Sequence, residues 1–445
     1  MVVSNSLKNL TREGRRARVL HMAYACSPWR GSEPGVGWRR AFEAAKYSDV
    51  WVICEQTEFE HQIRRYLDEV GAVEGMRFEF VAKTNFEERL SKIPGIYYLA
   101  YRRWHRRAIR AARQLHQQVH FDLVHQVTLC GYREPGELHT MNVPFVWGPV
   151  GGTQNYPWKA LSQAGWWGGL QEAVRSTLNS VQLRLSRRVR QAARRADCLL
   201  AANTTNGRDL QRVAGRPVPV MLETGSPPVD EDELAIRSSE ERLGRPLRVL
   251  WAGNLLAFKA LPLLLEAMAQ LPPTCDVRLR VVGDGPQEDR CRRIADRLKI
   301  ADRIDWAGRV RDVEMKQHYQ WADLLAFTSL RDTSGNVIFE ALANGVPVIG
   351  ADHQGIGDIV TSECGVKIDV DTPRRMVRAY RDVLLALAQD TKRMELLSEG
   401  AIARAIELSW PHQGERMRDY YRALLGDGYE WRPRAAVQPA AVEVG

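Results

Sequence analysis

Short apolar runs alternate with longer stretches of mixed polar and apolar residues along most of this 445-residue chain. Each apolar run has the length of a buried strand, and each intervening stretch is long enough for a helix, which is typical of βαβ units and a parallel sheet. The runs form two groups of six, at 18–24, 49–54, 78–82, 121–127, 143–148 and 197–202, and at 247–253, 277–285, 303–308, 323–329, 346–350 and 365–369. We therefore predict two successive doubly wound α/β sheets.

The length of the chain also fits two domains of about 200 residues each. A polar, acidic and proline-containing stretch separates the two groups of predicted strands. We predict an N-terminal domain over 1–225, a linker over 226–246 and a C-terminal domain over 247–408. Residues 431–445 are expected to form a disordered tail. In doubly wound sheets, ligands bind outside the carboxyl ends of the strands, so the loops after the strands are the candidate sites.

Composition and cysteine usage favour a cytoplasmic globular protein. No apolar run approaches the ~18 residues that a membrane-spanning helix needs, and the polar, basic first residues lack the apolar core of a secretory signal. The seven cysteines are odd in number, far apart and never in a CxxC pair. This spacing argues against a disulfide framework and against a zinc site. We expect reduced thiols.

Two arginine-rich stretches dominate the charge of the first half, and the whole chain carries a net charge of +9. They lie at 101–113 and 184–195, and each has six arginines. With aromatic and apolar residues among the arginines and GWWGGL at 165–170 nearby, such helices suit an anionic membrane surface. The alternative is a solvated basic face. No nucleic-acid-binding motif accompanies the charge, so we expect no nucleic-acid partner.

The segment SLRDTSGNVIFEALANGVP, at 329–347, is the strongest candidate site. A strand ends in polar residues, and a helix begins after Gly335 and Asn336, where free N–H groups and the helix dipole favour a diphosphate. Carboxylates accept hydrogen bonds from paired hydroxyl groups, so Glu340 suits a ribose and Asp332 a sugar. The alternative is a helix N-terminus with a capping acid and one solvated glutamate.

A glycine-rich loop, CSPWRGSEPGVGW at 26–38, follows the first predicted strand. Glycines let a backbone approach a phosphate or sugar closely, so we assign Gly35 and Gly37 to donor binding. Glu33 and Trp38 are expected to face an acceptor. The loop suits NAD equally well, and Glu55 at the end of the second strand keeps that alternative open. The stretches 131–134 and 148–154 should also line a cleft, with Arg133 as a candidate acceptor or phosphate contact.

The segment 329–347 resembles the E-x7-E region of retaining glycosyltransferases of the GT-B fold, family four of the sequence-based classification, with Asp332 in place of the first glutamate. The family's other motifs follow in its order: a lysine-bearing stretch at 251–267, a VVGDGP turn at 281–286 and WAGRV at 306–310. The resemblance covers nearly all of 247–370, and the first half matches more loosely. It implies two Rossmann-like domains facing each other across a cleft, with a final helix at about 409–430 packing back on the first domain.

This resemblance also implies an activity. The expected reaction moves a sugar, with retention of configuration, from a nucleotide sugar to a glycan or lipid-linked acceptor, in cell-surface polysaccharide or glycolipid biosynthesis and without a metal or other cofactor. Lys259 would neutralise the leaving diphosphate, His125 would point at the transferred sugar, and Asp332 completes the implied catalytic set. Besides Lys259, the implied donor-binding residues of the second domain are Gly253, Asn254, Gly283, Arg309, Val310, Ser334, Gly335, Asn336, Val337 and Glu340. A peripheral position on the inner face of the plasma membrane is the expected location.

Several alternatives stay open. The D-x-D strings at 369–371 and 230–232 are the pattern of metal-binding glycosyltransferases of another fold, but their positions favour solvated acids. Asn254 stands where the family has an arginine, which leaves a degenerate sugar-binding protein as one alternative. A nucleotide-sugar 2-epimerase of the same shape and an NAD-dependent oxidoreductase are the others.

Overall fold

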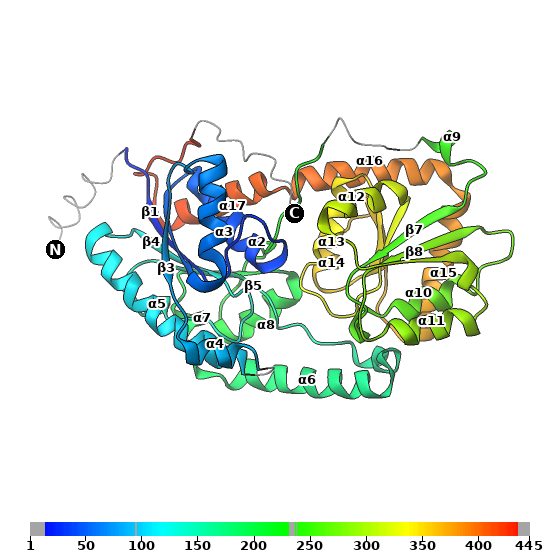
Figure 1. The fold of residues 1–445 in the computed structure, drawn as a ribbon, viewed down its shortest axis with the longest axis horizontal. Coiled ribbons are helices and arrows are strands. Elements are labelled where there is room, and N and C mark those ends of the chain that lie inside the picture. Colours follow the sequence, from blue (N-terminus) through cyan, green and yellow to red (C-terminus); the bar gives the residue numbers. More distant parts are fainter. Residues whose placement is uncertain (1–13, 94–95, 231–235, 237, 435–445) are drawn as a thin grey trace.

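Two six-stranded parallel sheets form the framework of the protein in a computed structural model that describes residues 14–93, 96–230, 236 and 238–434 (Figure 1). The strand orders are β3-β2-β1-β4-β5-β6 and β12-β11-β10-β7-β8-β9. In each sheet the order reverses beside a central strand, between β1 and β4 and between β7 and β10, and ligands bind at such reversal points. The predicted pair of doubly wound α/β sheets is confirmed.

The first sheet and its helices occupy the first half of the chain. Its strands are β1 (Arg18–Ala23), β2 (Asp49–Glu55), β3 (Met76–Val81), β4 (Leu123–Thr128), β5 (Phe145–Val150) and β6 (Cys198–Ala201). The helices are α2 (Ser32–Ala45), α3 (Gln56–Val70), α4 (Asn85–Ser91), α5 (Tyr97–Val119), α6 (Gly165–Leu185), α7 (Arg187–Arg195) and α8 (Thr204–Ala214), with short 3-10 turns η1 (Leu138–Thr140) and η2 (Trp158–Ala164).

The second sheet repeats the pattern. Its strands are β7 (Leu247–Ala252), β8 (Val277–Val282), β9 (Ile304–Gly308), β10 (Leu324–Phe327), β11 (Val348–Ala351) and β12 (Gly365–Ile368). The helices are α9 (Ser239–Arg242), α10 (Leu261–Met268), α11 (Glu288–Arg297), α12 (Asp312–Trp321), α13 (Asn336–Ala343), α14 (Gln354–Ile359), α15 (Pro373–Gln389), α16 (Thr391–Glu407) and α17 (Trp410–Leu425), with turns η4 (Ala257–Lys259) and η5 (Ala301–Arg303).

The strands formed where apolar runs were predicted because helices cover both faces of each sheet. All six residues of β4 and all six of β5 are buried, and strands buried on both faces consist of nearly continuous apolar residues. Each of the twelve predicted runs overlaps one observed strand. All seven cysteines lie in the described part of the chain, and all are free thiols.

The final helix, α17, crosses from the second domain to the first, where it packs against α2 (Figure 1). The chain then follows the first domain as far as Arg434, whose guanidinium pairs with Asp49 at 2.6 Å. The tail predicted to be disordered from 431 is therefore wrong for residues 431–434, because this ion pair and the hydrogen bond from Trp431 to Gly426 fix them. Residues 435–445 lie outside the described residues.

A second segment crosses in the opposite direction. Tyr156, Ala160 and Ala164, in and just before η2, are buried in the hydrophobic core of the second domain. Arg290 of α11 donates a hydrogen bond to the Gln163 carbonyl at 3.1 Å. Helix α6 then runs back along the lower edge of Figure 1, beneath both domains. The predicted first domain of 1–225 therefore does not hold for 156–164, which pack with the second domain.

The predicted linker is also attached to the second domain where it is described. The Ser226 N–H donates to the Leu408 carbonyl at 2.9 Å, which places the start of the linker beside the start of α17. Helix α9 packs on α16, and its Arg242 pairs with Asp323 at 2.8 Å. Residues 231–235 and 237 of the predicted linker lie outside the described residues.

Candidate functional site

A pocket of about 240 Å³ lies between the two domains, at the carboxyl ends of β1, β4 and β10. Its first-domain wall comes from the loops after β1, β4 and β5 and from the stretch before the linker, and its second-domain wall comes from the loop after β10. The lining residues are Ser32, Glu33, Val36, Cys130, Gly131, Gly151, Gly152, Glu223, Thr224, Thr333 and Asn336. This is the position that the reversal of strand order in the first sheet predicts.

The loop between β10 and α13 touches both domains. The Thr333 hydroxyl accepts a hydrogen bond from the Gln154 side chain at 2.6 Å, and the Thr333 carbonyl accepts one from Asn203 at 2.8 Å. Gly335 then precedes α13 with a φ of +84°, and a side chain there would lie 2.8 Å from the Phe327 ring. Glycine is therefore required where α13 begins, and the free N–H groups of its first turn lie beside the pocket that Asn336 lines.

Two of the three predicted catalytic residues are paired with each other. The Lys259 ammonium group at the end of η4 forms an ion pair with the Asp332 carboxylate, and both side chains are mostly buried. Thr328 holds the Lys259 carbonyl through a 2.6 Å hydrogen bond, and Gln354 accepts a 2.8 Å hydrogen bond from the Asp332 N–H. The structure thus places one cation on the carboxylate of the loop that leads into α13.

Glycine is also required in the loops after β7 and β8. Gly253 and Gly283 have φ values of +143° and +125°, and a side chain at Gly283 would lie 2.0 Å from the Gly253 carbonyl oxygen. The Gly283 N–H also donates to the Gly308 carbonyl at 2.7 Å, which links the β8 and β9 ends. The loops that carry these predicted donor residues therefore form one packed edge of the second sheet.

The remaining predicted donor residues differ in exposure. Asn254 and Arg309 are exposed, and Val310 is partly buried beside the second-domain core. Glu340 lies in α13 and accepts a 2.7 Å hydrogen bond from the Tyr319 hydroxyl. Ser334 is almost completely buried, and a hydrogen bond between its hydroxyl and the Glu223 carboxyl acts against the rise in the pKa of Glu223. The side chain of Val337 is half-buried against the second core.

The first-domain predictions are less successful. Trp38 is buried, with its ring 4.8 Å from that of Tyr66 and 5.8 Å from that of Phe78, so it packs in the core instead of facing an acceptor. A side chain at Gly37 would lie 2.1 Å from the Ala25 carbonyl oxygen, and one at Gly35 would lie 2.5 Å from that of Arg30. These glycines allow α2 to approach the preceding loop, which is a packing reason and not a ligand contact.

Arg133 does not point freely into the pocket. Its guanidinium donates hydrogen bonds to Asn179 at 2.7 Å and to Gln182 at 3.1 Å, both on α6. The predicted acceptor or phosphate contact is thus replaced by a contact that holds α6 on the loop after β4.

His125 is the clearest error. The imidazole is completely buried in β4, its Nε2 lies 2.6 Å from the Gly148 carbonyl oxygen, and its Nδ1 lies 2.6 Å from the Tyr421 hydroxyl. Because a carbonyl only accepts, Nε2 carries the proton and Nδ1 accepts from Tyr421. Burial lowers the pKa of His125 to about 3. Both nitrogens are used inside the core, so this side chain cannot contact a sugar in the pocket.

A second acid, Glu223, lines the pocket beside Glu33 and was not predicted from the sequence. Glu223 precedes the predicted linker in an irregular stretch with no motif, and no sequence signal identified it. Burial, reinforced by the charges of Glu33 and Asp332, raises the pKa of Glu223 to about 8. Glu33 itself accepts a 2.5 Å hydrogen bond from the Cys130 N–H, and burial raises its pKa. The predicted acceptor-side position of Glu33 is thus part of a two-carboxyl wall.

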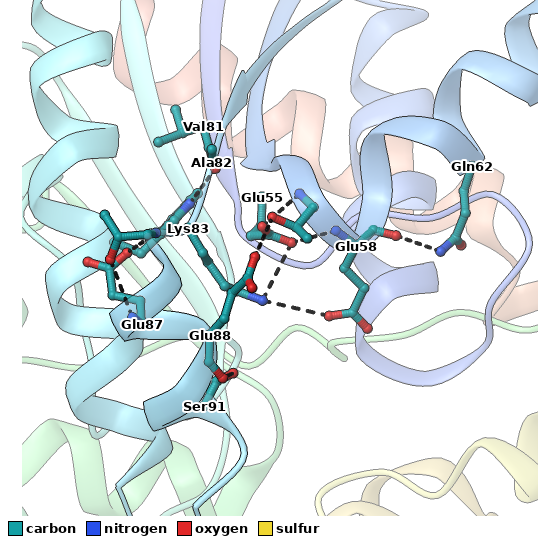
Figure 2. A network of polar contacts seen from close by, with 12 residues as sticks. Glu55, Glu58, Gln62, Val81, Ala82, Lys83, Glu87, Glu88 and Ser91 are labelled. Carbon is teal, nitrogen blue, oxygen red and sulfur yellow. Dashed lines mark hydrogen bonds and ion pairs between the residues drawn. The ribbon is translucent and has the colours of Figure 1, made fainter.

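Glu55, which kept the dinucleotide alternative open, is a helix cap (Figure 2). Its carboxylate accepts hydrogen bonds from the Thr57 and Glu58 N–H groups, each at 2.8 Å, at the start of α3. Lys83 lies 3.5 Å from the same carboxylate, which is completely buried. A ribose hydroxyl cannot reach a carboxylate that is enclosed in this way, so the structure gives the dinucleotide alternative no support.

The two D-x-D strings carry ion pairs of their own. Asp371 pairs with Arg375 at 2.7 Å, and Asp230 lies 3.4 Å from Lys316. Across the described residues, His, Cys, Asp and Glu side chains form no group of three or more with the arrangement of a metal site. Across the same residues, no helix combines the length and the apolar character that crossing a bilayer requires.

The second domain is similar to a known protein family. Residues 246–386 match the family model of the Glycosyl transferases group 1. The D-inositol 3-phosphate glycosyltransferase of Xylanimonas cellulosilytica is 32% identical over 223 residues, which are 48% of this chain and 52% of that protein. The chain thus spans about half the length of the curated relatives it matches.

Solved structures of GT-B glycosyltransferases match almost the whole chain. Sucrose-phosphate synthase from Thermosynechococcus elongatus superposes with a TM-score of 0.60 over 92% of this chain and 99% of its own, at 18% identity. HepE from Anabaena, in complex with UDP, superposes with a TM-score of 0.58 over 92% and 100%, at 16% identity. Another structure of HepE holds UDP-glucose. The predicted GT-B arrangement of two Rossmann-like domains is confirmed.

Proposed function

Because residues 246–386 match the family model of the group 1 glycosyl transferases, we propose that this protein moves a sugar from a nucleotide-sugar donor to a hydroxyl-bearing acceptor. The observation that carries the proposal is the Lys259–Asp332 pair, whose carboxylate directly precedes the pocket residue Thr333 in the loop before α13. One cation, one carboxylate and a set of free N–H groups suit a diphosphate joined to a sugar.

On this proposal the second domain holds the donor. The diphosphate lies against the N-terminus of α13 and the Lys259 ammonium group, which leaves Asp332 when the more highly charged phosphate arrives. Lys259 then neutralises the charge that develops on the leaving diphosphate. The loops of Gly253, Gly283 and Arg309 hold the nucleoside, Glu340 the ribose and Asp332 the sugar. Lys259 and the helix dipole supply the stabilisation, without a metal ion.

The acceptor occupies the first-domain side of the pocket. Glu33 and Glu223 line that wall, and carboxyl groups accept hydrogen bonds from the hydroxyl groups of a glycan. The transfer retains configuration, with the acceptor attacking on the face of the leaving group and the departing phosphate taking its proton. A glycan or lipid-linked acceptor, at the cytoplasmic face of a membrane, completes the proposed role in cell-surface polysaccharide or glycolipid synthesis.

A panel of nucleotide sugars tests the donor assignment. UDP-glucose is the first choice, because HepE, which shares the fold, was solved with it. A bound donor raises the melting temperature by an amount that grows with the logarithm of its affinity, and we expect one member of the panel to stabilise the protein but not its Lys259→Ala variant. The stabilising donor is then incubated with a crude glycolipid fraction, and the products are analysed by mass spectrometry.

The outcomes separate the alternatives. Transfer of the sugar to an acceptor supports the proposal. Free nucleotide with an epimerised sugar, formed without any acceptor, would identify a 2-epimerase instead. Stabilisation without turnover would identify a degenerate sugar-binding protein, and stabilisation by NAD alone would overturn the donor assignment.

A further inference from the structure

Helix α6 faces the protein with its polar side and the solvent with its apolar side. Seven large apolar side chains on it are between 48% and 81% exposed, and most recur at spacings of three or four residues, which places them on one face of the helix. They are Trp166, Trp167, Leu170, Val174, Leu178, Val181 and Leu185. We refer to these seven residues as the α6 stripe.

The opposite face of α6 holds polar side chains, and the protein satisfies them. Glu172 pairs with Arg331, the Ser176 hydroxyl accepts from the Tyr156 N–H at 3.2 Å, and Asn179 donates to the Thr153 carbonyl at 2.6 Å. These contacts fix the rotation of the helix about its axis. These contacts on the inner face keep the α6 stripe exposed to solvent, and rotation of the helix cannot bury it.

A continuous apolar stripe of this kind indicates an interaction surface, because soluble proteins expose large apolar side chains singly and not in rows. Two neighbouring tryptophans at one end, Trp166 and Trp167, are the most exposed of the set. Indole rings, with an apolar body and one N–H donor, concentrate in the headgroup region of bilayers.

The charge around the stripe identifies the partner. The only acidic side chain on α6 is Glu172, which faces inward and is paired. Beyond the stripe, the end of α6 and the adjoining α7 carry arginines that form no ion pair with any described residue: Arg184, Arg187, Arg194 and Arg195. A second copy of this surface would bring the same cations and no carboxylate to meet them. An anionic surface is complementary to it.

The other arginine-rich stretch is mostly neutralised. Arg102 pairs with Glu134 at 2.6 Å, Arg106 lies 3.9 Å from Glu137, and Arg107 pairs with Glu87 at 2.5 Å. These arginines of α5 hold the first domain together. Both stretches, 101–113 and 184–195, were predicted to contact an anionic membrane. The structure favours this contact for the second stretch only.

We propose that α6 lies flat on an anionic bilayer, with the α6 stripe inserted between lipid headgroups and the arginines of α6 and α7 on lipid phosphates. The helix contacts both domains, since Glu172 binds the second domain and Asn179 the first. Bilayer binding would therefore hold the two walls of the interdomain pocket at the membrane, where a lipid-linked acceptor resides. This last consequence rests on the proposed function, whereas the binding itself does not.

Flotation of the full chain with vesicles tests the proposal without any substrate. We expect the protein to float with vesicles of equal parts phosphatidylcholine and phosphatidylglycerol. With vesicles of phosphatidylcholine alone, it should remain in the bottom fraction. Replacing Leu170, Leu178 and Leu185 by glutamine should lower the partition coefficient by about tenfold or more, because each exposed leucine loses its burial in lipid. The matched control replaces Leu243 and Leu396, two exposed leucines of the second domain, and should leave binding unchanged.

A second variant separates charge from insertion. Replacing Arg187, Arg194 and Arg195 by glutamine should remove the preference for anionic vesicles and the sensitivity of binding to salt, because each basic residue near an anionic surface contributes about 1 kcal/mol. The control replaces Arg64 and Arg65, which are exposed on α3. Circular dichroism confirms that each variant is folded.

Three results would overturn the proposal. One is the absence of binding to anionic vesicles, and another is an equal loss of binding in the control variants. The third is a concentration-dependent dimer that the three leucine replacements abolish, since a second copy of the chain would then cover the stripe. None of these results depends on sugar transfer, so failure of the transferase assignment remains distinguishable from failure of membrane binding.

Discussion

Arg331 and Glu172 join the two domains through a bidentate ion pair, with Nε to Oε2 at 2.8 Å and Nη2 to Oε1 at 3.0 Å. Arg331 precedes Asp332 directly and also packs over the Phe258 ring, 4.1 Å from its centre. The loop that carries the candidate sugar-binding carboxylate is therefore positioned by a helix from the first half of the chain. A movement that separates the two domains at this point must therefore break the ion pair between Arg331 and Glu172.

Replacing Glu172 by glutamine should lower the free energy of unfolding by about 2–3 kcal/mol, because it leaves the Arg331 guanidinium mostly buried without a counter-charge. The KM for the donor should rise as Asp332 loses its support. Urea denaturation and donor titration measure the two effects. The control is Glu69→Gln, which breaks an exposed ion pair with Arg65 and should cost under about 1 kcal/mol. Equal losses in both variants would contradict the interdomain role.

Replacing Asp332 by asparagine should change binding and catalysis in opposite directions. The variant frees Lys259 from its ion pair, so a nucleoside diphosphate should bind several-fold more tightly. Transfer should slow by about 10²-fold, because the carboxylate that holds the sugar is lost. Calorimetry with UDP and a transfer assay measure the two quantities, with Asp305→Asn, at an exposed pair with Arg280, as the control. Weaker UDP binding by Asp332→Asn would contradict the proposed exchange of partners.

The strands of both sheets were predictable, and the α6 crossing was not. A parallel strand buried on both faces shows its burial directly as an apolar run. Helix α6 gives the opposite signal, because its buried face contains Glu172, Ser176 and Asn179, and its large apolar residues, except Leu183, face outward. The polar partners of that face come from distant parts of the chain. Amphipathic pattern alone therefore assigns the wrong face to the core.

In the candidate site too, residues within continuous motifs were predictable, whereas contacts between residues far apart in the sequence were not. Gly335 and Lys259 were identified because their motifs are continuous in sequence. The environment of His125 depends on Tyr421, which is 296 residues further along the chain. The high pKa of Glu223 depends on Glu33 and Asp332, which also lie far away in sequence. No local pattern reports such neighbours.

Glu223 should make the stability of the protein fall as the pH rises. Its pKa is raised from 4.5 to about 8 in the folded state by burial and by Glu33 and Asp332. Between these two values the folded protein retains a proton that the unfolded chain has released, so unfolding becomes easier with increasing pH. In Glu223→Gln the loss of stability between pH 4.5 and 8 should be smaller than in the wild type. Urea midpoints across this range measure the difference, and parallel profiles of both proteins would contradict it.

Replacing Glu33 by glutamine tests the cause of that shift. Removing a neighbouring negative charge lowers the cost of ionising Glu223 in the folded protein, so the fall in stability should end at a lower pH and be smaller in total. Because burial also raises the pKa of Glu33, adding Glu33→Gln to Glu223→Gln should still change the profile, but by less than Glu33→Gln changes the profile of the wild type. Additive effects of the two replacements would show that the carboxyl groups do not interact.

His125 and Tyr421 should act as one structural unit that joins α17 to the first sheet. Tyr421→Phe leaves the buried His125 Nδ1 without a donor, and it should lower the free energy of unfolding by about 1–2 kcal/mol. His125→Leu should cost at least as much, and the double variant should cost less than the sum of the two, because the hydrogen bond between the two residues can be lost only once. Stability should also fall as the pH drops from 6.5 towards 3, since burial lowers the pKa of His125 to about 3 and only the unfolded chain takes up the proton there.

Transfer by the folded His125→Leu protein should fall by less than about tenfold, whereas a general acid or base at this position would contribute about 10²-fold or more. A loss of that larger size, with stability unchanged, would return His125 to the active site.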